Sequence, residues 1–263
     1  MFGIRLRALV LAVVLALALP VTGCNAQQPT AQPLRVQVLQ TFPHDPGMYT
    51  QGLEISDGVL YEGSGQVGQS RVRAVRFSGA TVGPLLDEAA LPVPLFGEGI
   101  THTGARLWQL TWTDGVAIER DPQTLDERRR VRYQGEGWGL CHDGNRLVMS
   151  DGSDRLTFRD PVTFARTGQV EVRLDGEPAR HLNELECAGP AVWANVYLTD
   201  RILRIDPRTG AVTGVVEAGG LLTAAQRADA DVLNGIAAIP GTDEFLITGK
   251  NWPTLFRVRF TPA

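Results

Sequence analysis

A short motif returns five times along this chain: a glycine or polar residue followed by Leu or Ile, with a polar or aromatic residue just before it. The Leu and Ile residues that end the copies are 47, 40, 45 and 51 residues apart. A repeat of about 45 residues with strand-like content is typical of a β-propeller blade. We therefore predict an all-β fold, a five-bladed β-propeller. The copies are Gln51-Gly52-Leu53, Glu98-Gly99-Ile100, Trp138-Gly139-Leu140, Asn183-Glu184-Leu185 and Asn234-Gly235-Ile236.

Each copy is followed by a turn signal and by alternating strands. The five units account for residues 34–260, and the fifth has no sequence left for a fourth strand. We predict that the unclaimed strand 34–41 pairs with strand 255–260, which closes the ring and removes an exposed edge. Thr223 is a potential N-cap, and residues 223–232 are predicted to form a short helix. The turn signals, which favour positive φ in hairpins, are Asp57-Gly58, Thr103-Gly104, Asp143-Gly144 and Ala188-Gly189.

Composition narrows the class of protein. A chain of 263 residues can form one domain with a sizeable core. Its 43% hydrophobic and 21% charged residues are ordinary for a globular protein. A formal charge of −4 gives no reason to expect nucleic acid as a partner.

The first 24 residues have the features of an export signal. Arg5 and Arg7 precede an apolar run, 8–19, which is too short to span a bilayer comfortably. The small residues before Cys24 resemble a bacterial lipobox, so we predict lipidation of Cys24, an exported lipoprotein of the cell envelope or periplasm, and membrane contact only through this anchor. The alternative is a plain signal peptide with Cys24 incidental. Residues 25–33 are predicted to be a tether and 34–263 the catalytic domain.

Cysteine and histidine usage gives no metal motif. The chain has no CxxC, and its four histidines are scattered, so neither a zinc site nor a cofactor is expected. Cys141 and Cys187 lie within two residues of a motif on neighbouring inner strands. Although export permits a disulfide, we predict that both are buried free thiols.

Hairpin geometry predicts where a functional site would lie. In an antiparallel pair, the residue two before each motif-ending Leu or Ile lies beside a residue about twelve positions after it. Both sets therefore fall on one rim, around the mouth of the central channel. In the first set the residue type differs from one repeat unit to the next, whereas residues needed only for the fold would be the same in each. We therefore predict a composite site, to which several units contribute different side chains. The second set is Gly65, Trp112, Gly152, Tyr197 and Lys250.

Two charged residues of these sets point to catalysis. Lys250 is the only lysine among the 25 Lys and Arg residues. Because arginine serves as the surface cation elsewhere in the chain, a generic surface role does not explain this lysine. The alternative is that Lys250 lies on a surface turn and is there by chance. Glu98 lies between two glycines and near Phe96, whose apolar ring would raise the pKa of the carboxyl toward the range of a general acid/base. The alternative for Glu98 is a turn acid that bonds local amides, and for Glu136, which is out of register, we favour that alternative.

Aromatic residues fall in or beside the same sets. Trp108 and Trp193 lie within strands and are predicted to pack between blades. Four others, together with Gln51 and Asn183, are predicted to line a pocket. These four are Tyr49, Trp112, Trp138 and Tyr197.

As a set, the segments around these residues resemble the plant-type glutaminyl-peptide cyclotransferases over nearly all of the chain after the tether. The resemblance rests on 49–53, 96–101, 136–140, 182–186, 192–196, 233–236 and 248–253. It implies a five-bladed propeller that converts N-terminal Gln to pyroglutamate without a metal, with Glu98 as the acid/base. Tyr49 and Tyr197 stand where the family pattern has Phe and Trp. The site we expect has Glu98 and Lys250 as catalytic residues and Gln51, Tyr49, Phe96, Trp112, Trp138, Asn183 and Tyr197 as substrate-binding residues.

Two other functions remain open at this point. A calcium-dependent lactonase or related hydrolase would need several acidic or amide side chains converging on the channel, and only Glu98, Asn183 and Asn234 qualify by sequence. A non-catalytic envelope scaffold would need neither Lys250 nor a lone glycine-flanked Glu. The expected partners are peptides or proteins with N-terminal Gln, and the chain is expected to be a monomer.

Overall fold

The computed structural model describes residues 2–3 and 30–263. The predicted signal sequence 1–24, the lipidation site Cys24 and most of the predicted tether therefore lie outside the described residues, apart from Phe2 and Gly3. In the part of the chain that is described, no helix is long and apolar enough to cross a membrane.

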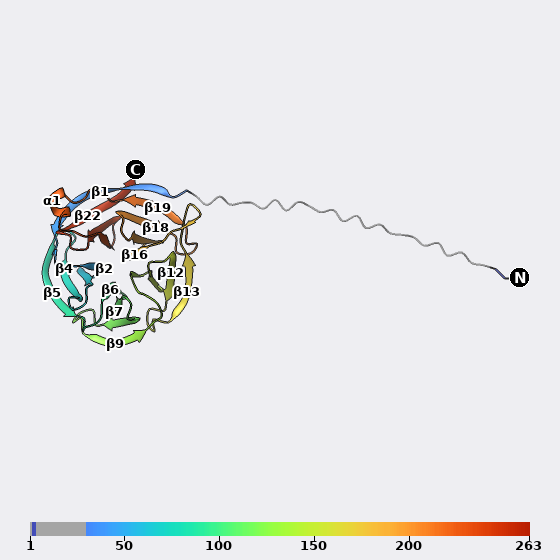
Figure 1. Ribbon diagram of the computed structural model, residues 1–263, viewed down its shortest axis with the longest axis horizontal. Coiled ribbons are helices and arrows are strands. Elements are labelled where there is room, and N and C mark those ends of the chain that lie inside the picture. Colours follow the sequence, from blue (N-terminus) through green and yellow to red (C-terminus); the bar gives the residue numbers. More distant parts are fainter. Residues whose placement is uncertain (1, 4–29) are drawn as a thin grey trace.

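The described chain is almost entirely β-structure, arranged as a ring of sheets around a centre (Figure 1). Three sheets have four antiparallel strands each, in sequence order from the centre outward. They are β2 (Thr50–Ser56), β3 (Val59–Ser64), β4 (Arg71–Phe77) and β5 (Val82–Ala90); β6 (Gly97–His102), β7 (Leu107–Thr111), β8 (Val116–Arg120) and β9 (Glu127–Arg132); and β10 (Leu140–His142), β11 (Leu147–Met149), β12 (Arg155–Arg159) and β13 (Arg166–Glu171).

The remaining strands form an eight-stranded sheet and a small hairpin. The eight-stranded sheet has the order β16-β17-β18-β19-β1-β22-β21-β20, and β14 pairs with β15. The bounds are β1 (Gln32–Pro43), β14 (Arg173–Leu174), β15 (Glu177–Pro178), β16 (Leu182–Ala188), β17 (Ala191–Val196), β18 (Arg201–Ile205), β19 (Val212–Glu217), β20 (Leu233–Ala238), β21 (Glu244–Gly249) and β22 (Thr254–Pro262). The all-β, propeller-like architecture predicted from the motif spacing is thus present.

Strand β1 closes the ring, as predicted. It pairs antiparallel with β22 from Leu34, opposite Pro262, to Pro43, opposite Thr254. The sequence did not indicate a second pairing: the first four residues of β1 also pair in parallel with β19. This contact covers the outer edge of β19, which would otherwise be exposed, and joins two four-stranded units into one sheet.

The turns and the helix follow the local sequence. Asp57 and Gly58 have φ of 51° and 75°, and Gly104, Gly144 and Gly189 also have positive φ. Helix α1 (Ala224–Arg227) begins after the predicted N-cap Thr223, whose side chain and that of Gln226 form a capping box. The helix is shorter than predicted because it buries no residue and because residues 231–232 pair with the backbone of Lys250.

The hydrophobic core lies between neighbouring sheets. Trp108 and Trp193 are buried there, as predicted. The Trp108 ring packs 4.8 Å from that of Phe164, and the Trp193 ring 5.1 Å from that of Phe245, measured between ring centres. These contacts fill the wedges between sheets and leave the rim aromatics free for other roles.

The prediction of free thiols is wrong, because Cys141 and Cys187 form a disulfide. Cys141 lies on β10 and Cys187 on β16, inner strands of neighbouring sheets, with their Cα atoms 5.4 Å apart. The physical reason is the close approach of these strands: a Cβ at Gly139 would lie 2.1 Å from the Asn183 carbonyl oxygen. Side chains facing each other across so narrow a gap can reach bonding distance.

Candidate active site

One pocket of about 210 Å³ lies at the centre of the ring, on the rim that the hairpin argument predicted. Its lining brings together all nine predicted site residues, from every repeat unit. They are Tyr49, Gln51, Phe96, Glu98, Trp112, Trp138, Asn183, Tyr197 and Lys250.

The repeated motif coincides with a repeated irregularity in the inner strands. The register shifts between Thr50 and Gly52, between Gly97 and Ile100, between Leu182 and Leu185, and between Leu233 and Ile236. These shifts enclose Gln51, Glu98, Asn183 and Asn234. A β-bulge re-aims a side chain, so the motif marks the points where an inner strand can turn a functional residue toward the pocket.

The glycines on either side of Glu98 let neighbouring backbone approach closely. A Cβ at Gly99 would lie 2.6 Å from the Trp138 carbonyl oxygen, and one at Gly97 would lie 2.8 Å from that of Ser64. The Gly99 N–H donates to the Trp138 carbonyl at 2.7 Å. These glycines therefore let neighbouring strands approach and fix the position of Glu98 between them.

Two glycines of the second rim set make room for aromatic rings. A Cβ at Gly65 would lie 2.4 Å from the ring of Phe96. A Cβ at Gly152 would lie 2.7 Å from the ring of Trp138. Gly65 and Gly152 therefore support the pocket wall without contributing a side chain to it.

Glu98 is 4% exposed, and two amide side chains are hydrogen-bonded to it one behind the other. Gln51 Nε2 donates to Glu98 Oε1 at 3.1 Å, and Asn234 Nδ2 donates to Gln51 Oε1 at 3.1 Å. No described residue donates a hydrogen bond to Glu98 Oε2. Burial raises the pKa of Glu98 well above its usual value, Lys250 opposes that shift, and Glu136 adds to it. The site thus has a carboxyl group that holds its proton more readily than an exposed one.

Lys250 follows β21 and is 3% exposed. Its ammonium nitrogen lies 4.8 Å from the centre of the Tyr49 ring and 4.9 Å from that of Tyr197. These distances are within the range of cation–π attraction. Burial lowers the pKa of Lys250, whereas Glu98 and Asp231 raise it. The surface alternative for Lys250 is therefore wrong.

The aromatic side chains of the pocket form two groups of contacting rings. Phe96 contacts Tyr49 and Trp112 edge-on, with ring centres 6.3 and 5.6 Å apart, and Trp138 contacts Tyr197 with ring centres 5.5 Å apart. Burial raises the pKa of Tyr49 to about 12, with Asp231 adding to the shift. Tyr49 is therefore a neutral part of the wall.

Glu136 is a pocket-mouth residue that the sequence analysis missed. Its Oε2 atom accepts hydrogen bonds from Trp112 Nε1 at 2.7 Å and from Trp138 Nε1 at 2.9 Å. Our preference for local amide bonding was wrong, because the residue lies between two indole rings from neighbouring repeat units. Its place two residues before Trp138, between Gly135 and Gly137, was the available signal.

Three more carboxyl groups, two of them buried, lie on inner strands, so the sequence-based count of channel acids was too low. Glu184 accepts hydrogen bonds from the N–H groups of Leu53 and Ile236, and burial raises its pKa well above the usual value. Burial also raises the pKa of Glu54, to about 7, and that of Glu186. In residues 2–3 and 30–263, no group of three or more His, Cys, Asp or Glu side chains is arranged to hold a metal ion.

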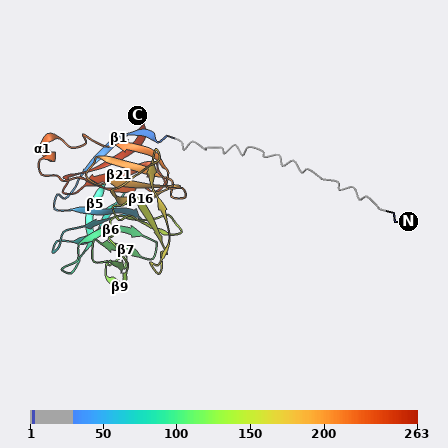
Figure 2. The same ribbon diagram turned by 45° about the vertical axis from the view of Figure 1, so that its right-hand side comes forward.

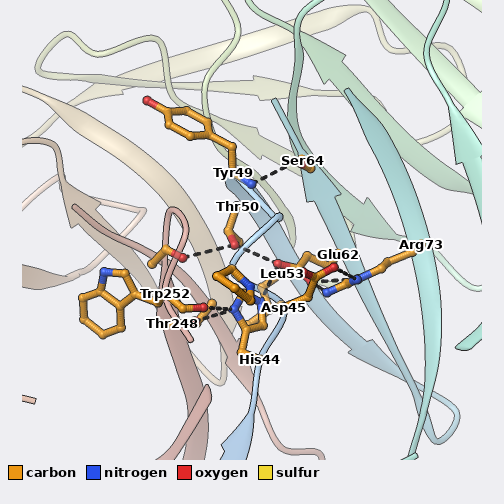
Figure 3. Close-up of polar contacts among 12 residues, drawn as sticks. His44, Asp45, Tyr49, Thr50, Leu53, Glu62, Ser64, Arg73, Thr248 and Trp252 are labelled. Atoms are coloured by element: carbon orange, nitrogen blue, oxygen red, sulfur yellow. Dashed lines mark hydrogen bonds and ion pairs between the residues drawn. The ribbon is translucent and has the colours of Figure 1, made fainter. Parts of the chain in front are cut away.

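A buried polar network lies beside the pocket, where β1 meets β2, β3 and the end of β21 (Figure 3). Glu62 accepts from His44 Nε2 at 2.9 Å, from Thr50 Oγ1 at 2.7 Å and from Arg73 at 3.0 Å. His44 Nδ1 lies 2.6 Å from the Trp252 carbonyl oxygen. Because both ring nitrogens face acceptors, both carry protons, and the pKa of His44 is raised by Glu62 against the opposing effect of burial.

Figure 2 shows the molecule turned by 45°, with strand β1 along one side of the ring. The chain continues from the end of β1 at Pro43 through His44 to Tyr49. Thr50, which donates to Glu62, directly precedes Gln51. Trp252, whose carbonyl oxygen faces His44, is two residues after Lys250. Closure of the ring therefore also supports the pocket.

Glu98, Lys250 and the aromatic rings thus line one pocket at the centre of a propeller-like ring. The model of the glutamine cyclotransferase family matches residues 10–260, and the chain belongs to this family. The glutaminyl-peptide cyclotransferase of Arabidopsis thaliana is 37% identical over 234 residues, covering 87% of this chain and 72% of that protein. The crystal structure of Myxococcus xanthus glutaminyl cyclase superposes with a TM-score of 0.78 at 37% identity, covering 89% of this chain and 99% of that one.

Proposed function

We propose that this chain is a glutaminyl-peptide cyclotransferase, which converts the N-terminal Gln of peptides and proteins to pyroglutamate and releases ammonia. The observation that carries the proposal is the single pocket in which Glu98 and Lys250 are buried among the other seven predicted residues. Membership of the glutamine cyclotransferase family supports the same conclusion.

The proposed reaction suits a pocket with few charged groups. The α-amine of the substrate attacks its own γ-carboxamide carbon, so a new C–N bond closes a five-membered ring and the bond to the carboxamide nitrogen breaks. Because the nucleophile is tethered to the electrophile, the enzyme needs mainly to orient the side chain. Glu98 takes the proton that the attacking amine loses and gives it to the leaving nitrogen, which departs as ammonia.

The surroundings of Glu98 support this role. A carboxyl with an ordinary pKa would hold almost no proton at neutral pH, whereas burial here raises its pKa. Gln51 fixes one oxygen, which leaves the other for the substrate. Lys250 and Asn183 line the same pocket and are the proposed donors to the carbonyl oxygen as it gains charge.

We also propose that the reaction is independent of metal. Proton transfer by Glu98 and charge stabilisation by Lys250 supply what a Lewis acid would supply elsewhere.

Five blades and export to the envelope belong to the same proposal. Dividing the eight-stranded sheet between β19 and β1 gives two four-stranded units like the three separate sheets, with β1 as the outer strand of the last unit.

The Cys141–Cys187 disulfide supports export, since such bonds persist in oxidising compartments. Lipidation of Cys24 is proposed on the lipobox-like sequence alone.

Mass spectrometry of a Gln-initiated peptide incubated with the purified protein tests the function. We expect the Gln peptide to lose the mass of one ammonia molecule and a matched Asn peptide to remain unchanged. A protein that alters neither peptide would favour the scaffold function, and hydrolysis of a lactone with added calcium would favour the hydrolase.

A further inference from the structure

Glu136 accepts hydrogen bonds from two of the pocket aromatics. A single oxygen, Oε2, accepts both indole N–H groups, at 2.7 Å from Trp112 and 2.9 Å from Trp138. The two rings come from consecutive repeat units, one after β7 and one before β10. Glu136 therefore adds a side-chain link between two walls of the mouth that are also joined through the backbone, where the Gly137 N–H donates to the Trp112 carbonyl at 2.9 Å.

The carboxylate also brings negative charge to the mouth. Glu136 is exposed, in the connection between β9 and β10. Its charge reaches the buried acid, because it contributes to the raised pKa of Glu98. On the opposite side of the pocket, Asp231 is exposed, and its backbone N–H donates to the Lys250 carbonyl at 2.9 Å.

The size of the pocket determines where the rest of a peptide must lie. A volume of about 210 Å³ is smaller than that of pockets which enclose drug-sized ligands. It accommodates one residue, so the second and third residues of a substrate must leave across the mouth. Trp112, at 41% exposed, lies along that exit together with Glu136.

We propose that Glu136 is a positioning and specificity residue, which aligns Trp112 and Trp138 and favours Gln peptides with a basic residue in the second or third position. The inference rests on the proposed function and deepens it by naming a substrate class. A carboxylate held at the exit attracts a Lys or Arg side chain and repels an Asp or Glu side chain.

Two variants separate the effect of the Glu136 charge from the effect of its hydrogen bonds to the two indole rings. Glu136→Gln keeps an oxygen that can accept both indoles but removes the charge. Glu136→Asp keeps the charge but is one methylene too short to bond both rings. Glu177→Gln makes the same charge change at an exposed residue outside the pocket lining and serves as the control.

The test compares kcat/KM for matched Gln-Arg and Gln-Glu peptides at low and high salt. For the wild type and Glu177→Gln we expect a preference for Gln-Arg that salt weakens. In Glu136→Gln the preference should fall by about two- to fivefold, the scale of exposed charge pairs. In Glu136→Asp the preference should persist while kcat falls for both peptides.

Titration of tryptophan fluorescence with the same two peptides, in proteins that also carry Glu98→Gln to slow turnover, gives the preference as a ratio of Kd. An unchanged ratio in Glu136→Gln would overturn the inference even if the enzyme is active. Absence of pyroglutamate from every Gln peptide, with the charge preference still visible in binding, would instead overturn the proposed function and leave the specificity role supported.

Discussion

The ammonium nitrogen of Lys250 lies 4.8 Å from the centre of the Tyr49 ring, in a space that Tyr197 bounds at 4.9 Å on another side. A compact ammonium fits between the two rings, whereas a planar guanidinium is larger and would displace one of them or the substrate. This contact explains why the chain retains one lysine at this position.

Lys250→Arg is therefore expected to reduce turnover nearly as much as Lys250→Ala, although it preserves the charge. Both variants should unfold within a few degrees of the wild-type temperature. Initial rates and thermal melts of the two variants measure this. A fully active Arg variant would show that only the charge of Lys250 matters.

Loss of the Cys141–Cys187 disulfide should lower stability without changing the reaction. The bridge closes a loop over a sequence separation of 46 residues, and a bond of this kind typically contributes about 2–4 kcal/mol to the free energy of unfolding. Neither sulfur lines the pocket. We expect the Cys141→Ser/Cys187→Ser double variant to unfold at lower denaturant with an unchanged kcat, and a large loss of kcat at full folding would contradict this.

Removal of Glu62 should change how stability depends on pH. His44, Thr50 and Arg73 hold the pKa of Glu62 at about 2. A carboxyl whose pKa is lower in the folded state stabilises the protein above its unfolded pKa, and that contribution is lost as pH falls from about 4.5 to about 2.

Glu62→Gln is therefore expected to cost about 3 kcal/mol at pH 6, and the difference from the wild type should shrink toward pH 2. Denaturant unfolding at several pH values measures this difference. The control is Glu88→Gln, which removes an exposed ion pair with Arg71 and should cost less than about 1 kcal/mol. Equal losses for the two variants, or a gap that does not depend on pH, would contradict the role of the buried pair.

Prolonged chelation should leave turnover unchanged, because the proposed proton transfer uses Glu98 alone. Rates measured before and after chelator treatment, and after adding zinc or calcium, test this. A rate that collapses and returns with one of these ions would require a metal in the mechanism.

The sequence predicted the all-β ring, its closure and seven of the nine pocket residues through motif spacing and hairpin geometry, which are local and repeat in every unit. Tyr49 and Phe96 lie beside these sets and were named from the segments that flank them. The β-bulges at Gln51 and Glu98 could not be predicted, since they depend on pairing with strands whose register the sequence does not specify. The disulfide and the Glu136 contacts join neighbouring units. Their formation depends on how closely the inner strands pack, which the spacing of residues does not reveal.

The most direct measurement is the turnover of Glu98→Gln with a Gln-initiated peptide. The substitution keeps the size of the side chain and an oxygen for the Gln51 hydrogen bond, but the amide cannot carry a proton from the amine to the leaving nitrogen. We predict a loss in kcat of roughly 10²–10⁴-fold, the usual contribution of general acid/base catalysis, with an unchanged melting temperature. Activity within a few-fold of the wild type would contradict the assignment of Glu98 as the acid/base of this enzyme.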